Sequence, residues 1–412
     1  MKVFKFGGAS VKDAESVMNV GKVLESQGFE NCLLVVSAMG KTTNALENVV
    51  KLYFEKNNHQ AEIQKIKDNH IEIANGLFPE NHSVFDEISL FFDDIISFLR
   101  RNKSPNYNFV YDQVVSCGEM ISSKILSEYL NEKGFSNQWL DSRDFIKTSS
   151  NYREGIVDWA ETEQNINKLN KSQSYVTQGF IGSDENNFTV TLGREGSDYS
   201  AAIFAYCLDA SAMTIWKDVP GVMTGDPRKF ENVELLANIS YEEAIEMAYY
   251  GASVIHPKTL QPLKQKHIPF FVKSFIEPEK LGTKVGISEE NQQTESYILK
   301  ENQVLMHIAT RDFSFIAEEH LSLIFSLLAK YQIKISLMQN SAISLALCLE
   351  DKYHHIDALN EELNHNFNTE IAKSVSLFTV RNANMAEINK FYENKNVLLE
   401  QISKQTIQMI TN

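Results

Sequence analysis

The sequence predicts an α/β fold with a mainly parallel sheet, followed by a ferredoxin-like α+β region. Residues 2–40 have the pattern strand, glycine turn, helix, buried strand, which is typical of a βαβ unit. Strands and helices then alternate to about residue 285. Beyond the polar run at 288–295 the pattern becomes strand, helix, strand, strand, helix, strand, the ferredoxin-like order. We therefore expect a first domain over 1–290 and a second region over 300–412.

Length and charge limit the classes of function. The chain has 412 residues, of which 43% are hydrophobic and 23% charged, as in an ordinary globular protein of two or three domains. It carries 39 Lys and Arg against 54 Asp and Glu, a formal net charge of −15. Nucleic-acid binding needs a basic footprint and is not expected. An anionic substrate would have to meet cations that the fold gathers locally.

The cysteines and the N-terminus indicate a cytoplasmic protein. Four cysteines lie far apart without a CxxC pair, so we expect neither a disulfide framework nor a structural metal site. The first residues lead directly into Gly7 and Gly8 and form no apolar signal-peptide segment. No apolar run approaches the ~18 residues that a membrane helix needs.

In the first domain, each element is predicted from its hydrophobic pattern. Residues 2–6 form a short strand, and 13–27 carry Val17, Val20 and Leu24 at helical spacing. Residues 32–36 form a continuous apolar run, typical of a strand buried on both faces. Ser240 and Glu243 fit a capping box that opens a helix. The other expected elements are helices over 45–105, from 119 to 130 and over 200–208, strands at 175–181, 189–192, 213–216 and 270–272, and loops at 104–108, 193–198 and 217–229.

The second region should hold one complete ferredoxin-like module and a reduced second one. About 113 residues follow position 299, whereas two full modules need roughly 150. After Asn382 there is room for one helix and one or two strands. The expected elements of the complete module are strands at 303–310, 333–339, 343–350 and 372–381 and helices at 317–330 and 354–365.

The glycine turn after the first strand suits an anion. Gly7 and Gly8 let backbone N–H groups approach a phosphate, and Lys5 can reach it as a point charge. A tight turn beside a solvated lysine is the simpler alternative. Gly40-Lys41-Thr42 is not a P-loop, because that motif needs glycine where this chain has Val35.

Two further loops follow buried strands, where open α/β sheets bind ligands. In the stretch 191–201, Arg194 suits a carboxylate or phosphate, and Asp198 could orient a nucleophile, lie near magnesium or merely cap a helix. The stretch 216–228 sets two carboxylates and two cations between Pro-Gly and Asp-Pro turns. His256, before Pro257, is read as a packed turn residue more readily than as a base.

In this order, the motifs resemble those of aspartate kinases in the amino acid kinase family, and the C-terminal part resembles ACT regulatory modules. The resemblance implies a three-layer sandwich for the first domain and the MgATP-dependent phosphorylation of L-aspartate to 4-phospho-L-aspartate. It also implies the first step of lysine, threonine and methionine synthesis. The motifs are KFGGAS at 5–10, VVSAMGKTTN at 35–44, SCGE at 116–119, TQGFIG at 177–182, TLGREGSDYSA at 191–201, WKDVPGVMTGDPR at 216–228 and YYGASVIHPKTLQPL at 249–263.

The same resemblance implies roles for individual residues. Lys5 and Asp198 would be catalytic, and Mg²⁺ would enter with ATP. No general base is needed, because the accepting carboxylate is already ionised at neutral pH. Aspartate would be held by Ser37, Thr43, Glu119, Arg194 and Ser197, with Glu119 facing its ammonium group. The nucleotide would be held by Lys5, Gly7, Gly8, Ser10, Lys217, Asp218, Asp226 and Arg228.

The ACT resemblance implies an amino acid effector and a homodimer or larger assembly. Lysine-sensitive members often carry an acidic residue where this chain has Ser336, so lysine and threonine both remain candidates. The expected effector residues are Ser336, Gln339, Asn340 and Ser341.

Departures from the family pattern keep two alternatives open. Glu195 replaces a common glycine, Met223 an aromatic residue and Ser253 a lysine. One alternative is a related kinase acting on another acid such as acetylglutamate; the other is a catalytically inactive amino acid sensor. A fused homoserine dehydrogenase is not expected, since no second βαβ nucleotide domain follows within the chain.

Overall fold

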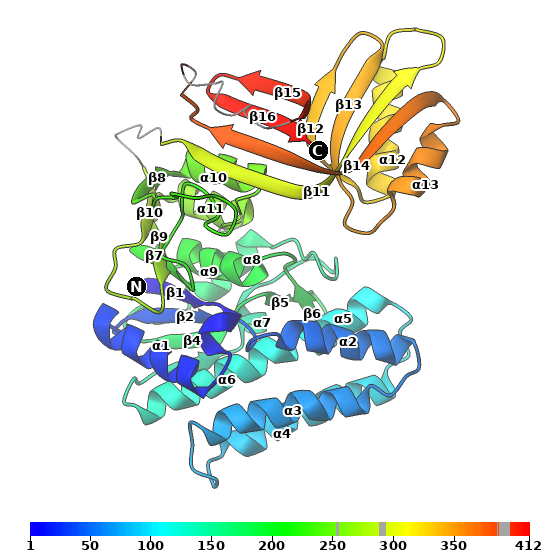
Figure 1. The fold of residues 1–412 in the computed structure, drawn as a ribbon. Helices are drawn as coiled ribbons and strands as arrows, with labels where there is room; N and C mark the ends of the chain where they lie inside the picture. The colour runs from blue at the N-terminus through cyan, green and yellow to red at the C-terminus, as the bar shows by residue number, and fades with distance from the viewer. Residues whose placement is uncertain (253–254, 288–293, 385, 387–395) are drawn as a thin grey trace. The chain divides into compact units, whose positions relative to one another are not determined.

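A computed structural model describes residues 1–252, 255–287, 294–384, 386 and 396–412. The chain divides into two compact units, each described here by itself (Figure 1). The expected boundary run at 288–295 lies mostly outside the described residues, and the module composition of the second region remains a prediction. The first unit comprises Met1–Val222, Leu235–Ile245 and Val254–Glu289, and the second Met223–Glu234, Glu246–Ser253 and Glu290–Asn412.

An eight-stranded sheet forms the centre of the first unit, in the order β3-β4-β2-β1-β7-β9-β10-β8. All neighbouring strands are parallel except β9 and β10, which confirms the predicted mainly parallel sheet. The N-terminal strand β1 lies inside the sheet, between β2 and β7. The strands are β1 (Lys2–Phe6), β2 (Cys32–Val36), β3 (Gln138–Leu140), β4 (Tyr175–Gln178), β7 (Ala212–Lys217), β8 (Asn238–Ser240), β9 (Phe270–Ser274) and β10 (Thr283–Gly286), with a separate antiparallel pair β5 (Ile181–Ser183) and β6 (Thr189–Thr191).

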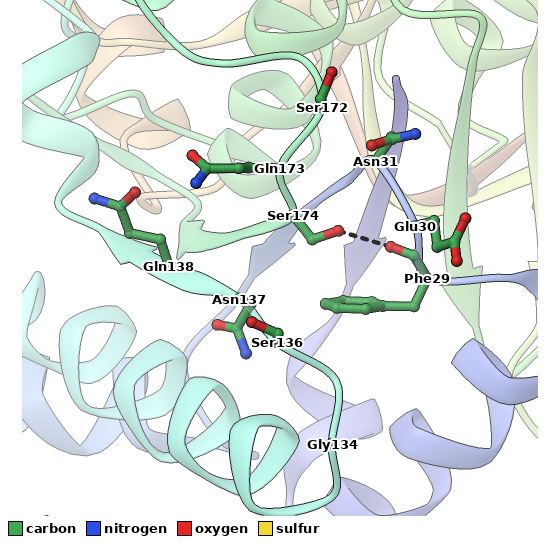
Figure 2. A pocket seen from close by; sticks show the side chains of 10 residues that line it. All are labelled: Phe29, Glu30, Asn31, Gly134, Ser136, Asn137, Gln138, Ser172, Gln173 and Ser174. Atoms are coloured by element: carbon green, nitrogen blue, oxygen red, sulfur yellow. Dashed lines mark hydrogen bonds between the residues drawn. The ribbon is translucent and has the colours of Figure 1, made fainter.

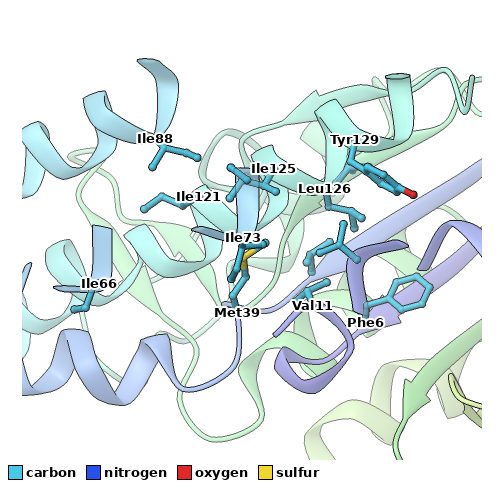
Figure 3. Close-up of a cluster of buried hydrophobic side chains, with 14 of the residues drawn as sticks. Phe6, Val11, Met39, Ile66, Ile73, Ile88, Ile121, Ile125, Leu126 and Tyr129 are labelled. Atoms are coloured by element: carbon cyan, nitrogen blue, oxygen red, sulfur yellow. The ribbon is translucent and has the colours of Figure 1, made fainter. Parts of the chain in front are cut away.

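Helices cover both faces of this sheet, which gives the three layers. Phe4 and Phe6 belong to a large hydrophobic core shared with α1 to α6, and Figure 3 shows part of this core, including Phe6. Val3 and Lys5 alternate to the opposite face, where α9 packs on β1, β2 and β7. The helices are η1 (Gly8–Val11), α1 (Ala14–Gln27), α2 (Thr42–Phe54), α3 (Gln60–Asn75), α4 (Val84–Arg101), α5 (Tyr107–Val115), α6 (Cys117–Glu132), α7 (Ser142–Phe145), α8 (Trp159–Ile166), α9 (Gly196–Cys207), α10 (Tyr241–Tyr250) and α11 (Pro257–Gln265).

Capping explains where some helices begin, and the bounds of three expected elements are corrected. Ser240 accepts the backbone N–H of Glu243, as the capping box predicted. The expected loop at 104–108 is shorter, because Asn106 caps α5 and the helix starts at the next residue. The expected loop at 193–198 gives way to α9 from Gly196. The expected strand at 175–181 is interrupted after β4 and resumes as β5.

The second unit is built on a six-stranded antiparallel sheet, in the order β12-β13-β11-β14-β16-β15. Its first six elements follow the predicted ferredoxin-like order, and both helices contribute to one hydrophobic cluster with β11 and β13. β11 and β14 are 15 residues long, and their pairing shifts register between Lys300 and Leu305. The elements are β11 (Ser296–Thr310), α12 (Glu318–Lys330), β12 (Lys334–Asn340), β13 (Ser344–Glu350), α13 (Ile356–Leu363), β14 (Phe367–Arg381), β15 (Val397–Ser403) and β16 (Thr406–Thr411).

After Asn382 the structure has two strands, within the expected range. Residues 387–395 lie outside the described part, so the helix expected in this region stays a prediction. Across the described residues, no helix combines the length and apolar character needed to cross a membrane.

Candidate active site

Two turns meet at the carboxyl ends of β1 and β2. The backbone N–H of Gly40 donates to the carbonyl of Gly8 at 3.0 Å, and that of Ser37 donates to Phe6 at 3.1 Å. A methyl group on Gly8 would lie 2.7 Å from the carbonyl oxygen of Ala38, closer than a Cβ atom can approach. Only glycine therefore allows these turns to pack together. This edge of a parallel sheet is where ligands are expected.

A buried ion cluster lies beside the turns. Lys5 Nζ is 2.6 Å from Asp198 Oδ1, and Lys217 Nζ is 3.5 Å from Asp198 Oδ2. Lys5 faces α9 from β1 and pairs with Ile215 of β7. Lys217 follows Ile215 by two residues, so its side chain lies on the same face of the sheet as that of Lys5. Asp198 comes from the first turn of α9. The structure thus brings together two sequence-predicted catalytic residues and one nucleotide residue.

The charges of this cluster are held in place by the fold. Burial opposes the charged form of Asp198, but the ammonium groups of Lys5 and Lys217 outweigh it and hold the pKa of this carboxyl below its usual range. A methyl group on Gly7 would lie 3.5 Å from Lys5 Nζ, so the ammonium group lies over the glycine turn. Lys5 and Lys217 place two ammonium groups at this edge of the sheet in an otherwise acidic chain. The site can therefore attract an anion.

Glu119 adds a second kind of polar group. It lies in the first turn of α6 and is 2% exposed. One carboxyl oxygen accepts the backbone N–H of Ala38 at 3.4 Å, and the other is buried without a hydrogen-bond partner among the described residues. Burial raises the pKa of Glu119 to about 8. A buried carboxyl group with an unsatisfied oxygen is suited to a cationic ligand group.

Glu195 is a site residue whose place the sequence did not predict. It precedes α9 in the left-handed conformation, at φ 53°, which disfavours side chains other than glycine and asparagine. One of its carboxyl oxygens is buried and has no hydrogen-bond partner in the described chain. Burial raises its pKa, Asp198 raises it further and Lys217 opposes this. The sequence shows glutamate where the family often has glycine, but it does not show that the Glu195 side chain lies in the ion cluster.

The remaining predicted residues of the first unit lie on turns and helix starts that follow its strands. Ser37 begins the turn after β2, Thr43 lies in the first turn of α2, and Ser197 in the first turn of α9. A methyl group on Gly179, which follows β4, would strike Ser197 at 2.5 Å, so α9 begins directly against the sheet. Ser10 is buried, Arg194 is exposed on the loop before α9, and Asp218 is exposed after β7.

Two predicted nucleotide residues fall in the second unit. Asp226 and Arg228 form an exposed ion pair at 2.8 Å, in which Arg228 also donates to Asp226 from its backbone N–H. Their role stays a prediction, as does that of Met223, which belongs to the same unit. The departure at Ser253 lies outside the described residues. His256 caps α11 by accepting the backbone N–H of Lys258, in line with its reading as a turn residue.

The expected effector residues lie along β12 and the turn after it. Ser336 is buried, donates to Gln303 Oε1 at 3.0 Å and accepts from Lys300 Nζ at 3.4 Å. Gln339, Asn340 and Ser341 are exposed. At ~3.3 Å per residue, Ser336 and Ser341 lie roughly 16 Å apart along the strand.

A separate cavity opens at the opposite ends of the strands. It has a volume of about 610 Å³ and lies before β2, β3 and β4 (Figure 2). Ser174 donates to the carbonyl of Phe29 across it, and its side chains are mainly amides and hydroxyls. Since it lies at the amino ends of these strands, we do not assign it to the candidate active site. The lining residues are Phe29, Glu30, Asn31, Gly134, Ser136, Asn137, Gln138, Ser172, Gln173 and Ser174.

The sequence of the chain matches the model of one protein family. The model of the amino acid kinase family matches residues 1–274. The chain belongs to the amino acid kinase family. The match includes Lys5, Glu119, Asp198 and Lys217, the four residues around which the candidate site is built.

Within the amino acid kinase family, the chain is similar to aspartokinases. Lysine-sensitive aspartokinase 3 of Escherichia coli is 33% identical over 358 residues, covering 84% of this chain and 78% of the relative. A bifunctional aspartokinase/homoserine dehydrogenase of Buchnera aphidicola is 31% identical over 390 residues, covering 88% of this chain. The chain spans 46% of that relative, and thus about half its length.

Solved structures of aspartokinases share the fold. Aspartokinase III of E. coli in complex with lysine and aspartate matches with a TM-score of 0.83 at 28% identity, covering 100% of this chain and 95% of that one. The same enzyme in complex with aspartate and ADP also gives a TM-score of 0.83, with 96% of that chain covered. The α/β and ferredoxin-like architecture predicted from the sequence is that of these proteins.

Proposed function

We propose that the protein is an aspartate kinase, which transfers the terminal phosphoryl group of ATP to the side-chain carboxylate of L-aspartate. The products are ADP and 4-phospho-L-aspartate. The observation that carries the proposal is the buried cluster of Lys5, Asp198 and Lys217 beside a glycine turn at the carboxyl edge of the sheet. Its relatives are named aspartokinases, and one was solved with aspartate and ADP.

The chemistry needs positioning and charge stabilisation more than proton transfer. Phosphoryl transfer spreads negative charge over the moving phosphate, and the attacking carboxylate is itself an anion. In our proposal, Lys5 and the N–H groups of Gly7 and Gly8 bind the transferred phosphate, while Lys217 binds the nucleotide phosphates. Asp198 holds both ammonium groups in place. The accepting carboxylate is ionised at neutral pH, so no base acts in the step.

Aspartate would be recognised by its charges. Arg194 suits its α-carboxylate because a guanidinium group binds carboxylates through two parallel hydrogen bonds. Glu119 would accept the ammonium group with its unsatisfied oxygen, and this favours the charged form of the glutamate. Ser37, Thr43 and Ser197 would complete the set of hydrogen-bond donors, and Ser10, Asp218, Asp226 and Arg228 the nucleotide site.

Magnesium would enter with the nucleotide. In the described part of the chain no group of three or more His, Cys, Asp or Glu side chains could hold a metal ion on its own. A cation bound mainly by phosphate oxygens needs few protein ligands. Glu195, with a buried carboxyl oxygen that lacks a hydrogen-bond partner, fits as a protein ligand. The ion would supply charge neutralisation between the phosphates.

The assignment of the second region belongs to the same proposal. We propose a catalytic domain over 1–290 and an ACT regulatory region over 300–412, with one complete module, a reduced second module and an effector, lysine or threonine. The edge strand β12 could pair two chains into a homodimer. The four cysteines are free thiols, consistent with work in the reducing cytoplasm.

The test is ATP-dependent formation of an acyl phosphate trapped by hydroxylamine. L-aspartate, L-glutamate and N-acetylglutamate are compared in parallel, each with and without lysine or threonine. We expect a product with aspartate alone, suppressed by one of the two effectors. Product with another acid would instead favour a related kinase with a different acceptor. No product from a folded protein that binds an amino acid would favour a catalytically inactive amino acid sensor.

A further inference from the structure

Asp112 is a fully buried carboxylate outside the cluster described above. It lies on α5 and is 0% exposed. Its Oδ2 accepts the backbone N–H groups of Arg153 and Thr191, both at 2.9 Å, and its Oδ1 accepts the hydroxyl group of Thr191 at 2.8 Å. A single side chain thus ties α5 to β6 and to the turn around residue 153. It is not among the residues that the proposed reaction uses.

These bonds complete the outer edge of β6. The strand pairs with β5 on one side only. On its other side, the carbonyl of Thr191 accepts the N–H of Gly155 at 2.9 Å, and the neighbouring Gln113 donates to Thr189 at 2.8 Å and accepts from it at 3.2 Å. Asp112 therefore satisfies the last backbone group before the strand ends. Asp112 differs from Gln113 in its position along the strand, because it binds Thr191 at the end of β6 whereas Gln113 binds Thr189 at the start.

The strand end leads directly to the proposed aspartate ligand. Arg194 follows Thr191 by three residues, with Leu192 and Gly193 between them. Leu192 is buried and donates its N–H to Phe180 at 2.8 Å. Gly193 has φ 78°, and a methyl group on it would lie 3.2 Å from the carbonyl of Arg153. Both backbones that Asp112 binds therefore border the loop that carries Arg194.

The turn is braced from a third element. Arg153 adopts a left-handed backbone, at φ 71°, and its guanidinium group lies 4.0 Å from the ring centre of Tyr111. The same group pairs at 3.1 Å with Glu47, which lies on α2 one turn after Thr43. α2, α5 and β6 are thus joined through one turn. Each of the three adjoins residues that the proposed function assigns to aspartate.

We propose that Asp112 is a positioning residue of the aspartate site, which fixes the end of β6 and thereby the place of Arg194. This inference rests on the proposed function. Asp112 does not touch the reacting groups. Its contribution is to reduce the freedom of the Arg194 loop before the substrate arrives, so its loss should appear in aspartate binding and not in the nucleotide site.

The decisive variant is Asp112→Asn, which keeps the shape of the side chain but replaces one accepting oxygen by a donating group. We expect the KM for aspartate to rise about tenfold, the factor that corresponds to one hydrogen bond to a charged group. The kcat and the KM for ATP should change less than about threefold, because Lys5 and Lys217 are untouched. The control is Gln113→Ala, on the same helix and strand but bound to Thr189. It should lower the thermal midpoint without changing the KM for aspartate.

The pH dependence gives a readout that a purely structural role would not. Burial raises the pKa of Asp112 to about 6, against the hydrogen bonds from Arg153 and Thr191. Arg153 and Tyr152 face it from the turn and Tyr111 from α5, while Glu47 on α2 faces Arg153. Below pH 6 the protonated carboxyl loses an accepting oxygen. Protonation of Glu119 lowers aspartate affinity from about pH 8 downward, so Asp112 should add a second fall below pH 6, and Asp112→Asn should remove only that second fall.

Three outcomes separate the possibilities. If the wild type forms no acyl phosphate from aspartate, the proposed function fails and the inference with it. If the wild type is active but Asp112→Asn leaves the KM for aspartate unchanged, or Gln113→Ala raises it equally, the inference alone is overturned. If Asp112→Asn does not fold, Thr191→Val against Thr191→Ser tests the hydroxyl bond, and only the valine variant should weaken aspartate binding.

Discussion

Replacing Lys5 by alanine should separate the stability of the ion cluster from its catalytic use. Lys5 and Asp198 are 8% and 3% exposed, and their charged atoms lie 2.6 Å apart. Removing one partner of a buried pair costs about 3–5 kcal/mol of unfolding free energy, because the other charge stays buried. Lys217 remains 3.5 Å from Asp198, so we expect the lower end, about 3 kcal/mol.

The assay measures two quantities on the same variants. Urea unfolding gives the free energy, and hydroxylamine trapping gives turnover, which should fall at least about a hundredfold, as when a preorganised stabilising group is removed. The control is the double variant Lys5→Ala with Asp198→Asn. It should recover part of the lost stability, since the unpaired carboxylate is gone, and none of the turnover.

Three results would refute this reasoning. Lys5→Ala could unfold at the same urea concentration as the wild type, which would mean that the 2.6 Å contact contributes nothing. The two substitutions could also be additive in free energy, although residues in contact should be coupled by about 0.5–3 kcal/mol. Near-normal turnover of the alanine variant would remove Lys5 from the phosphate site.

Three further predictions follow from the same site. The pKa of Glu119, raised to about 8, means that the folded state holds a proton that the unfolded state releases near its ordinary value of 4.5. Between pH 6, the pKa of Asp112, and pH 8, unfolding free energy should therefore decrease as pH rises while aspartate affinity increases, and calorimetry on Glu119→Gln should show neither trend in that range. Glu195→Gly should raise unfolding free energy by about 1 kcal/mol by relieving the left-handed backbone, whereas Glu195→Gln should not. Both Glu195 variants should weaken Mn²⁺ binding in the presence of ADP, measured by electron paramagnetic resonance; unchanged binding would exclude the side chain as a ligand. Gly8→Ala should lower the thermal midpoint because its methyl group meets a carbonyl at 2.7 Å, whereas Gly7→Ala should fold normally and raise the KM for ATP; equal midpoints would contradict the packing of the two turns.

The sequence was sufficient where local pattern and chain order determine structure. The apolar run 32–36 and the spacing of Val17, Val20 and Leu24 predicted β2 and α1, and the six-element order after residue 295 predicted the second sheet. Element ends were less predictable, because caps decide them. Asn106 caps α5, a helix that the hydrophobic pattern did not predict, and α9 starts directly after the left-handed Glu195, before the expected residue 200.

The candidate site was predictable in its members and not in its geometry. Lys5, Asp198 and Lys217 were named from motifs, but only the parallel pairing of β1 with β7 places them around one another. Asp112 was missed altogether. An acidic residue inside the apolar stretch 109–115 was a visible signal, yet its three acceptor bonds depend on residues 41 and 79 positions away. Such long-range partners cannot be read from local spacing.

The central place of β1 has a consequence for how the protein is made. β1 is synthesised well before its partner strand β7, which ends at Lys217, more than two hundred residues later. At about 5–20 residues per second, translation needs roughly 10–40 s to supply that strand. During this time one edge of an apolar strand stays unpaired, a state prone to aggregation. The nascent chain should therefore depend on holding chaperones, and pausing of synthesis before residue 212 should lower its yield more than pausing after residue 217.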